Sequence, residues 1–219
     1  MSSSPESMIK RIILLLSFTL ALLNASGFAH SREGETERIL SFDSDIIVDV
    51  DGSMTVTESI TVYAANDQIK HGIYRDFPTR YKDRYRAAYN VSFEVLRVMR
   101  DGSPEPYHEE ALPNGKRVYI GSSQDFVPAG SHVYEITYKT DRQLGFFKDF
   151  DELYWNVTGN AWNFVIESAI ATVTLPMALS GNVRSYEAYT GPEGSKARDY
   201  SAYIDDNGRI VFSATKPFL

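Results

Sequence analysis

The sequence predicts an all-β fold, an antiparallel β-sandwich that is immunoglobulin-like in general architecture, and three observations carry this prediction. Apolar residues recur at every second position in several segments, which is the period of a half-buried strand. Turn dipeptides such as Asp-Gly and Asn-Gly separate these segments. Aromatic residues make up 13% of the 219 residues, and they favour strands over helices. We expect about nine or ten strands in two packed antiparallel sheets.

The N-terminus predicts a signal peptide over residues 1–29. Lys10 and Arg11 precede an apolar run at 12–23. This run is shorter than the roughly 20 residues that a membrane-spanning helix needs, and small residues follow it. We therefore expect cleavage after Ala29. An uncleaved anchor helix is the alternative.

The remaining residues predict a short leader and one domain. Residues 30–37 are polar and are expected to form a flexible leader, and residues 38–219 are expected to form a single extracytoplasmic β-sandwich domain. An exported chain without cysteine fits a bacterial envelope better than a disulfide-dense secreted scaffold. Because Leu219 follows the last predicted strand without a polar tail, we expect the chain to be part of a longer protein.

The first two strands predict a hairpin. Apolar residues occupy even positions from Leu40 to Val50 and from Met54 to Val62, on either side of Asp51-Gly52. A two-residue loop would place the two apolar sets on opposite faces, so we expect a three-residue loop, Val50-Asp51-Gly52, with Gly52 in the left-handed conformation. The expected cross-strand pairs are Ile46 with Val56, Phe42 with Ile60, and Ser44 with Glu58.

Later segments repeat the alternation between turn signals. In order, we expect strands at 89–95 before Asp101-Gly102, on both sides of Pro113-Asn114-Gly115, at 132–138, at 162–175 before Pro176, at 183–189, at 200–204 and at 210–214. At 154–156 a further strand is expected to lead into a tight turn at 158–160. There Asn156 should bond the backbone, and at least one of Trp155 and Trp162 should be mostly buried.

Composition excludes several classes of chemistry. The absence of cysteine removes zinc–thiolate sites, iron–sulfur clusters and thiol nucleophiles. Asp49, Asp51 and Glu58 have the spacing of calcium ligands in an EF-hand loop, but Ile47 stands where the first carboxylate belongs. Nucleophile-elbow, P-loop and Rossmann motifs are missing. We therefore expect no cofactor and no metal, and the net charge of -7 argues against nucleic acid.

One acidic cluster offers an alternative enzymatic function. Asp149, Asp151 and Glu152 precede Tyr154 and Trp155, and paired carboxylates beside aromatic residues can cleave glycosidic bonds. Acidic residues before a strand are more commonly a solvated turn.

Residues 70–86 are the strongest candidate for a binding surface. They contain six Lys or Arg and two Asp, a local charge of +4 in an acidic chain. We expect a connection of about 25 residues, longer than most loops in compact domains, anchored by His71-Gly72-Ile73 and Phe77-Pro78. A carboxylate should hold Arg75, while the later basic residues face solvent. The candidate binding residues are His71, Tyr74, Arg75, Arg80, Tyr81, Lys82, Arg84 and Arg86.

Such a segment can meet an anionic lipid, an acidic envelope polymer or an acidic face of a protein. The alternative is a structural loop whose arginines pair with the protein's own carboxylates.

Several motifs in this order resemble a known family. They are Asp51-Gly52-Ser53, the block His71-Gly72-Ile73-Tyr74-Arg75-Asp76-Phe77-Pro78, the alternating run from Gly130 to Tyr138, and the block from Glu152 to Gly159 with Trp162. Over residues 38–215 the chain resembles the predicted membrane proteins that carry domain of unknown function 2207. The resemblance implies a signal peptide, an extracytoplasmic β domain and then transmembrane helices. It implies no catalytic residues.

We therefore expect an exported, non-enzymatic binding or interaction module of a membrane-anchored bacterial envelope protein. The domain would face the periplasm or the cell exterior, and membrane attachment is implied by the resemblance alone. One alternative is a periplasmic hydrolase that acts on glycans through the carboxylates at 149–152. A second alternative is a structural spacer domain.

Overall fold

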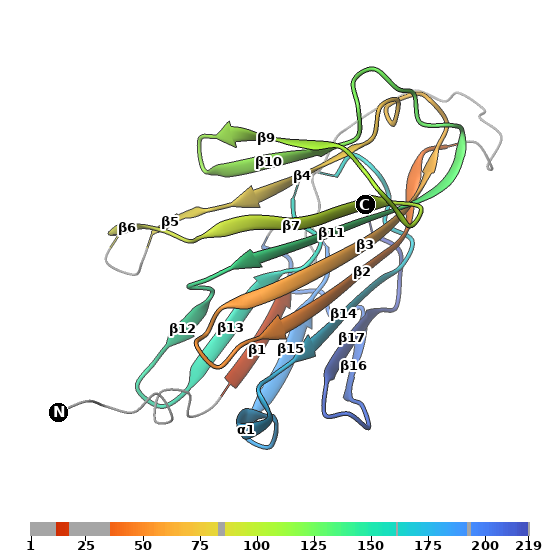
Figure 1. The fold of residues 1–219 in the computed structure, drawn as a ribbon. Coiled ribbons are helices and arrows are strands. Elements are labelled where there is room, and N and C mark those ends of the chain that lie inside the picture. The colour runs from red at the N-terminus through yellow and green to blue at the C-terminus, as the bar shows by residue number, and fades with distance from the viewer. Residues whose placement is uncertain (1–11, 18–35, 83–85, 161, 192–193, 219) are drawn as a thin grey trace.

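The computed structural model describes residues 12–17, 36–82, 86–160, 162–191 and 194–218, and strands dominate it (Figure 1). The helix α1 spans only Met177–Ser180. Successive residues of a strand lie on opposite faces of the sheet, which accounts for the alternating sequence pattern, and the many strands confirm the predicted all-β class. Residues 1–11 and 18–35, with the expected cleavage site at Ala29, lie outside the described residues, as does Arg84.

The largest sheet has eight strands in the order β16-β17-β14-β2-β3-β11-β7-β8. Most neighbours are antiparallel, but β2 and β14 are parallel. Their bounds are β2 Arg38–Val48, β3 Met54–Ala64, β7 Phe93–Arg100, β8 Ser103–Pro104, β11 Gly130–Thr140, β14 Ala169–Thr174, β16 Tyr200–Ile204 and β17 Ile210–Ala214.

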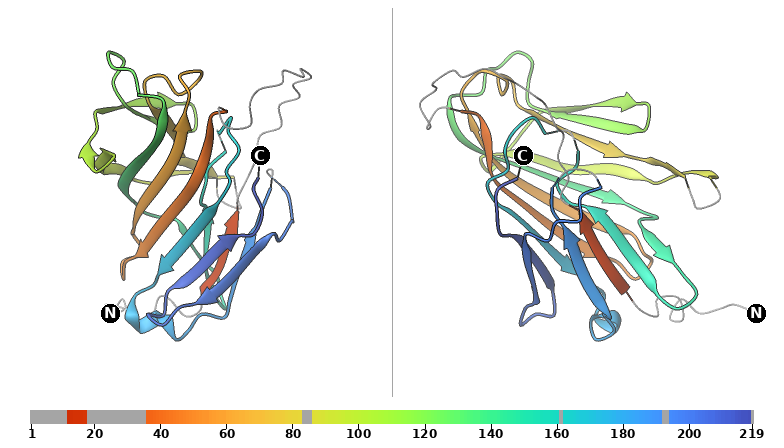
Figure 2. Two further views of the ribbon diagram at one scale, coloured as in Figure 1. Left: turned by 90° about the vertical axis from the view of Figure 1, so that its right-hand side faces the viewer. Right: turned by 180° about the vertical axis from the view of Figure 1, so that it is seen from behind.

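A four-stranded sheet in the order β12-β13-β1-β15 lies behind the large sheet in the view of Figure 1 and in front of it in the right-hand view of Figure 2. A three-stranded sheet, β4-β10-β9, and a two-stranded ribbon, β5-β6, complete the fold. Their bounds are β1 Ile12–Ser17, β4 Ile73–Pro78, β5 Arg80–Lys82, β6 Ala88–Asn90, β9 Tyr107–Leu112, β10 Gly115–Ile120, β12 Leu144–Phe146, β13 Asp151–Asn156 and β15 Ser185–Tyr189.

Two packed sheets match the expected sandwich. The immunoglobulin-like comparison is not confirmed, because eight strands lie in one sheet, whereas an immunoglobulin domain divides seven to nine strands between two. Side chains from both sheets share one core, in which Phe42, Ile46 and Leu153 are fully buried. Burial of these apolar faces against each other stabilises the sandwich.

The first hairpin forms as predicted. The Asp49 amide donates to the Ser53 carbonyl at 2.8 Å, which leaves a three-residue loop, and Gly52 has φ +81°. The three expected cross-strand pairs are all present. The expectation that Leu40 lies on the buried face is wrong: the register shifts between Ile39 and Ser41, so a bulge turns Ile39 into the core instead.

A bulge also changes the phase of β7. Val95 pairs with Tyr138 and Arg97 with Thr137, which leaves Leu96 unpaired and 51% exposed. Val98 is buried, although the apolar residues of the strand expected at 89–95 occupy odd positions, from Tyr89 to Val95.

The long strand expected at 162–175 is wrong. Strand β14 begins only at Ala169, and its buried residues are Ala169, Ala171 and Val173, while Ile170 is 36% exposed. Before it, Ile166 makes isolated bridges to Ile39 and Phe218. The prediction placed the larger apolar residues on the inward face. In the structure, the small side chains of Ala169 and Ala171 lie between the sheets here.

The long connection expected at 70–86 is also wrong, because this segment contains β4 and β5. In β4, Ile73, Arg75 and Phe77 are all buried. The inward face therefore alternates as a strand should, but a charged residue at its centre hides the pattern in the sequence.

A buried carboxylate holds the start of the domain. Glu37, the last residue of the expected leader, is 7% exposed. Its carboxylate accepts bonds from four backbone amides, those of Ala65, Asp67, Gln68 and Ile69.

Trp155 and Trp162 are partly buried and pack against the core. The Gly159 amide donates to Asn156 Oδ1 at 3.1 Å, which confirms the expected turn.

Candidate functional site

A buried ion pair forms the floor of the candidate site. Arg75 on β4 and Glu58 on β3 are 3% and 1% exposed. Arg75 donates from Nε to Glu58 Oε2 at 2.6 Å and from Nη2 to Glu58 Oε1 at 2.8 Å, a bidentate geometry. Tyr138 Oη donates to Glu58 Oε1 at 3.0 Å, and Arg75 Nη1 donates to the Thr158 carbonyl at 2.9 Å. This confirms the expectation that a carboxylate holds Arg75.

Aromatic rings surround the Arg75 guanidinium. Its central carbon lies 5.2 Å from the ring centroids of Phe42 and Phe77 and 5.4 Å from that of Trp162. Burial opposes the charge, but the Glu58 carboxylate outweighs it, so the net shift of the pKa of Arg75 is upward. Burial also raises the pKa of Tyr138 well above its usual value. The guanidinium therefore stays charged and the Tyr138 phenol stays protonated, which fixes the geometry of the floor.

A cleft of about 500 Å³ opens above this floor, between the β4–β5 segment, β11 and β13. Six aromatic residues line it: Phe77, Tyr81, Phe93, Tyr138, Tyr154 and Trp155. Four carboxamides also line it: Asn114, Gln143, Asn156 and Asn160. Aromatic faces beside neutral hydrogen-bonding groups suit a ligand that is apolar on its faces and polar at its edges.

Tyr81 connects the cleft to the predicted basic segment. It lies at the centre of β5, stacks on Tyr89 with ring centroids 5.7 Å apart, and donates from Oη to the Pro78 carbonyl at 3.1 Å. Burial raises its pKa. Arg80 and Lys82 flank it in the strand and are exposed, as is Arg86, which precedes β6. Because neighbours in a strand face opposite ways, the side chains of Arg80 and Lys82 lie beside the cleft and do not line it.

The structure separates the other predicted residues. Tyr74 lies on the face of β4 opposite Arg75, where the Arg117 guanidinium carbon sits 4.1 Å from its ring centroid. His71, ahead of β4, contacts the Asp125 carbonyl at 2.9 Å and packs on Phe126. The predicted segment therefore forms a floor, an exposed basic ribbon and two unrelated contacts.

The acidic cluster at 149–152 does not converge on the aromatic cleft. Asp149 is exposed in a loop, while Asp151 is buried in β13. Burial raises the pKa of Glu152. Asp151 and Glu152 are adjacent in one strand, so their side chains leave it on opposite faces.

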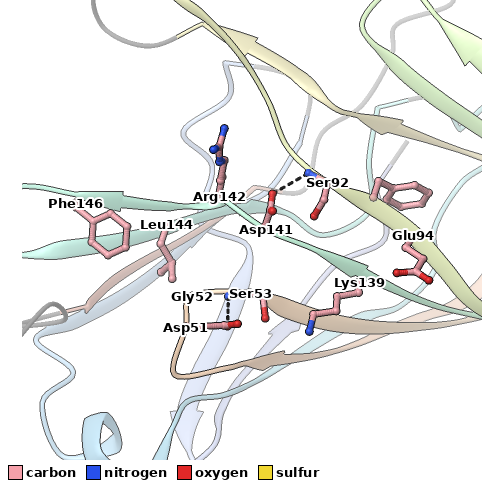
Figure 3. Close-up of a pocket in the computed structure, with 11 residues that line it drawn as sticks. Asp51, Gly52, Ser53, Ser92, Glu94, Lys139, Asp141, Arg142, Leu144 and Phe146 are labelled. Carbon is pink, nitrogen blue, oxygen red and sulfur yellow. Dashed lines mark hydrogen bonds between the residues drawn. The ribbon is translucent and has the colours of Figure 1, made fainter. Parts of the chain in front are cut away.

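A second cavity of about 630 Å³ lies beside the first hairpin (Figure 3). Its polar groups hold turns: the Ser92 amide donates to Asp141 Oδ1 at 2.7 Å, and the Ser53 amide donates to Asp51 Oδ1 at 2.9 Å. Figure 3 shows both bonds within the lining residues. Because only two aromatic residues, Phe93 and Phe146, border this cavity against six in the cleft, we regard the aromatic cleft as the better site.

Within the part of the chain that the structure describes, no group of three His, Asp or Glu side chains is arranged to hold a metal ion. None of the described helices is long and apolar enough to span a membrane.

No local pattern in the sequence indicates that Glu58, Tyr138 and Phe93 belong to one site, because they come from three distant strands. The aromatic pair Tyr154-Trp155 stands out in the sequence beside the acidic cluster. Only the fold shows that both residues border the cleft, Trp155 from the inward face of β13 and Tyr154 from its exposed face, and that the carboxylates do not.

Comparison with known proteins adds a family and a longer relative. Residues 38–216 match the model for the N-terminal domain of a predicted membrane protein, DUF2207. The chain is 32% identical over 204 residues to the uncharacterized protein YciQ of Escherichia coli strain K12, an alignment that covers 91% of this chain. The chain spans 32% of the length of that relative.

Solved structures give weaker likenesses. The native leukotriene A4 hydrolase of Saccharomyces cerevisiae matches 83% of this chain and 27% of its own, with 12% identity and a TM-score of 0.49. An M1 zinc metallopeptidase from Deinococcus radiodurans matches 81% of this chain and 38% of its own, with 9% identity and a TM-score of 0.44. Both likenesses are too distant to support an argument about activity. The family match over most of the chain carries the assignment: the chain belongs to the DUF2207 family of predicted membrane proteins.

Proposed function

We propose that this domain is an exported, non-enzymatic binding module of a membrane-anchored envelope protein, and that it binds a strand of acidic polysaccharide. Membership of a family of predicted membrane proteins supports the membrane attachment. The aromatic cleft over the Glu58–Arg75 pair is the observation that carries the binding function.

The lining of the cleft matches the chemistry of sugar chains. A sugar ring has apolar faces, which pack on aromatic rings, and hydroxyl groups at its edge, which bond carboxamides. Tyr154 is 53% exposed, whereas its neighbour Trp155 in β13 packs against the core. The cleft therefore offers one solvent-exposed and one partly buried aromatic residue.

The floor is rigid before any ligand arrives. Both oxygens of Glu58 and all three nitrogens of the Arg75 guanidinium are engaged in the bonds described above. A preorganised floor reduces the ordering cost of binding.

The basic ribbon supplies attraction at longer range. Arg80, Lys82 and Arg86 are exposed beside the cleft in a chain of net charge -7. A local positive patch concentrates an anionic polymer near the site and speeds its association. We therefore expect the ligand to be an acidic glycan whose sugar rings pack in the cleft and whose charged groups lie near the ribbon.

The test is a binding titration of the full chain with polygalacturonate oligomers, followed by tryptophan fluorescence. Neutral maltoheptaose and anionic lipid vesicles are the comparison probes. Replacing Tyr154 by Ala should weaken binding of the acidic oligomer about tenfold, because one aromatic contact contributes about 0.5–1.5 kcal/mol beyond its buried area. Tyr203→Ala is the matched control, since Tyr203 is also 53% exposed but lies on β16.

Equal affinities for the two variants would overturn the cleft as the site. Binding to vesicles alone would indicate a lipid surface instead of a glycan. Shortening of the oligomer during incubation would support a hydrolase and contradict a non-enzymatic module. Failure to bind any of the three probes would favour the structural spacer.

A further inference from the structure

The four-stranded sheet contains a strand that the sequence predicts to be removed. Strand β1, residues 12–17, belongs to the apolar run of the predicted signal peptide. It lies between β13 and β15 and is parallel to both (Figures 1 and 2). Six residue pairs join β1 to β13, from Ile12 with Asp151 to Ser17 with Asn156, and five join it to β15.

Strands β13 and β15 do not pair with each other. One strand separates them, so they lie about 10 Å apart, twice the usual spacing of paired strands. Strand β13 also pairs with β12, on the side away from β1. Strand β15 is joined to this sheet through β1. Removal of β1 therefore opens two facing strand edges and leaves β15 without a partner in the sheet.

The segments around this gap belong to the folded core. Leu153 on β13 and Ala188 on β15 are fully buried. Tyr186 on β15 packs edge-on against Phe212 of the large sheet, with ring centroids 6.1 Å apart. The gap is thus a slot in an ordered sheet and not a loose margin. Facing edges with unpaired backbone groups are templates for an added strand.

We propose that the slot between β13 and β15 is a strand-acceptor site, which binds an extended apolar peptide of about six residues in parallel to both edges. Residues 12–17, with the sequence Ile-Ile-Leu-Leu-Leu-Ser, occupy it here. After removal of the signal peptide, a partner polypeptide supplies a strand of the same chemistry. Backbone bonds to two neighbours provide the affinity, and the requirement for an apolar strand provides the selectivity.

Hydrogen exchange of the full chain tests this proposal. Leu14→Pro together with Leu15→Pro removes two consecutive amide donors, so each edge of the slot loses a bond. We expect residues 185–189 to exchange at least about tenfold faster in this variant, while β3 stays protected. A synthetic peptide of residues 10–18 added to the variant should restore the protection. The same peptide with proline at positions 14 and 15 is the control and should not.

Unchanged exchange at 185–189, or no restoration by the peptide, would overturn the proposal. If the proline variant also loses protection in β3, disulfide cross-linking replaces hydrogen exchange as the test. The chain has no cysteine, so Leu15→Cys with Glu187→Cys introduces one pair at positions that face each other in register. Cross-linking of this pair, but not of Leu15→Cys with Tyr203→Cys, supports occupancy of the slot. Equal cross-linking of both pairs, or of neither, contradicts it.

Discussion

The Glu58–Arg75 pair links the core to the cleft at the scale of single residues. Burying both charges is costly, and the bidentate contact with its extra bonds from Tyr138 and to Thr158 offsets that cost. Neither residue type predicts burial from sequence, because Glu and Arg are rarely buried unless paired. The sequence motif around Arg75 indicates that a carboxylate holds it, but it does not identify Glu58 as that partner.

Loss of one charge should therefore be severe. Glu58→Gln leaves the Arg75 guanidinium buried without a counter-ion, and we expect the free energy of unfolding to fall by about 3–5 kcal/mol. Urea denaturation of the full chain measures this change. Glu135→Gln is the control, because Glu135 pairs with Arg97 where the two side chains are 33% and 57% exposed, and it should cost less than about 1 kcal/mol. Similar losses for the two variants would contradict the assigned role.

At the scale of elements, turns were easier to predict than strand phases. The loop of the first hairpin follows from Asp51-Gly52 and from the need to place both apolar sets on one face. The predicted alternation of buried and exposed residues is wrong where a bulge inserts one residue, at Leu40 and at Leu96. A bulge depends on the neighbouring strand, so a single sequence carries no local signal for it.

The turn itself gives a test. Gly52 has φ +81°, and a Cβ there would lie 3.3 Å from Leu144 Cδ1. Gly52→Val should lower the free energy of unfolding by about 1 kcal/mol or more, because a β-branched residue resists positive φ. Gly181 is the matched control, since its φ is -80° and a Cβ added there would meet no atom within 4 Å. Thermal unfolding compares the two valine variants, and an equal loss of stability would contradict the turn geometry.

At the scale of the whole molecule, charge is distributed unevenly. The chain is acidic overall, yet the β5–β6 ribbon presents exposed basic residues next to the cleft. This arrangement separates two contributions to binding: contact in the cleft, which depends little on salt, and attraction by the ribbon, which salt screens.

Charge reversal of the ribbon should therefore weaken binding only at low salt. Arg80, Lys82 and Arg86 replaced by Glu should reduce affinity for acidic oligomers in dilute buffer. The difference from the unmodified chain should shrink toward 1 M salt, where the screening length is only about 3 Å. Reversal of the exposed Lys148, Arg184 and Lys196 is the control, with the same change in net charge. An equal loss in the control would assign the effect to overall charge and contradict a local patch.

The sequence by itself determined the all-β class, the three-residue loop of the first hairpin with its three cross-strand pairs, and the basic composition of residues 70–86. These features depend on residues close together in the chain, where period and turn chemistry act directly. Only the tertiary structure decided that 73–78 is a strand with a charge inside, that Glu58 is the partner of Arg75, and that β13 and β15 leave room for one strand. Each of these depends on segments far apart in sequence, and their contacts leave no local pattern.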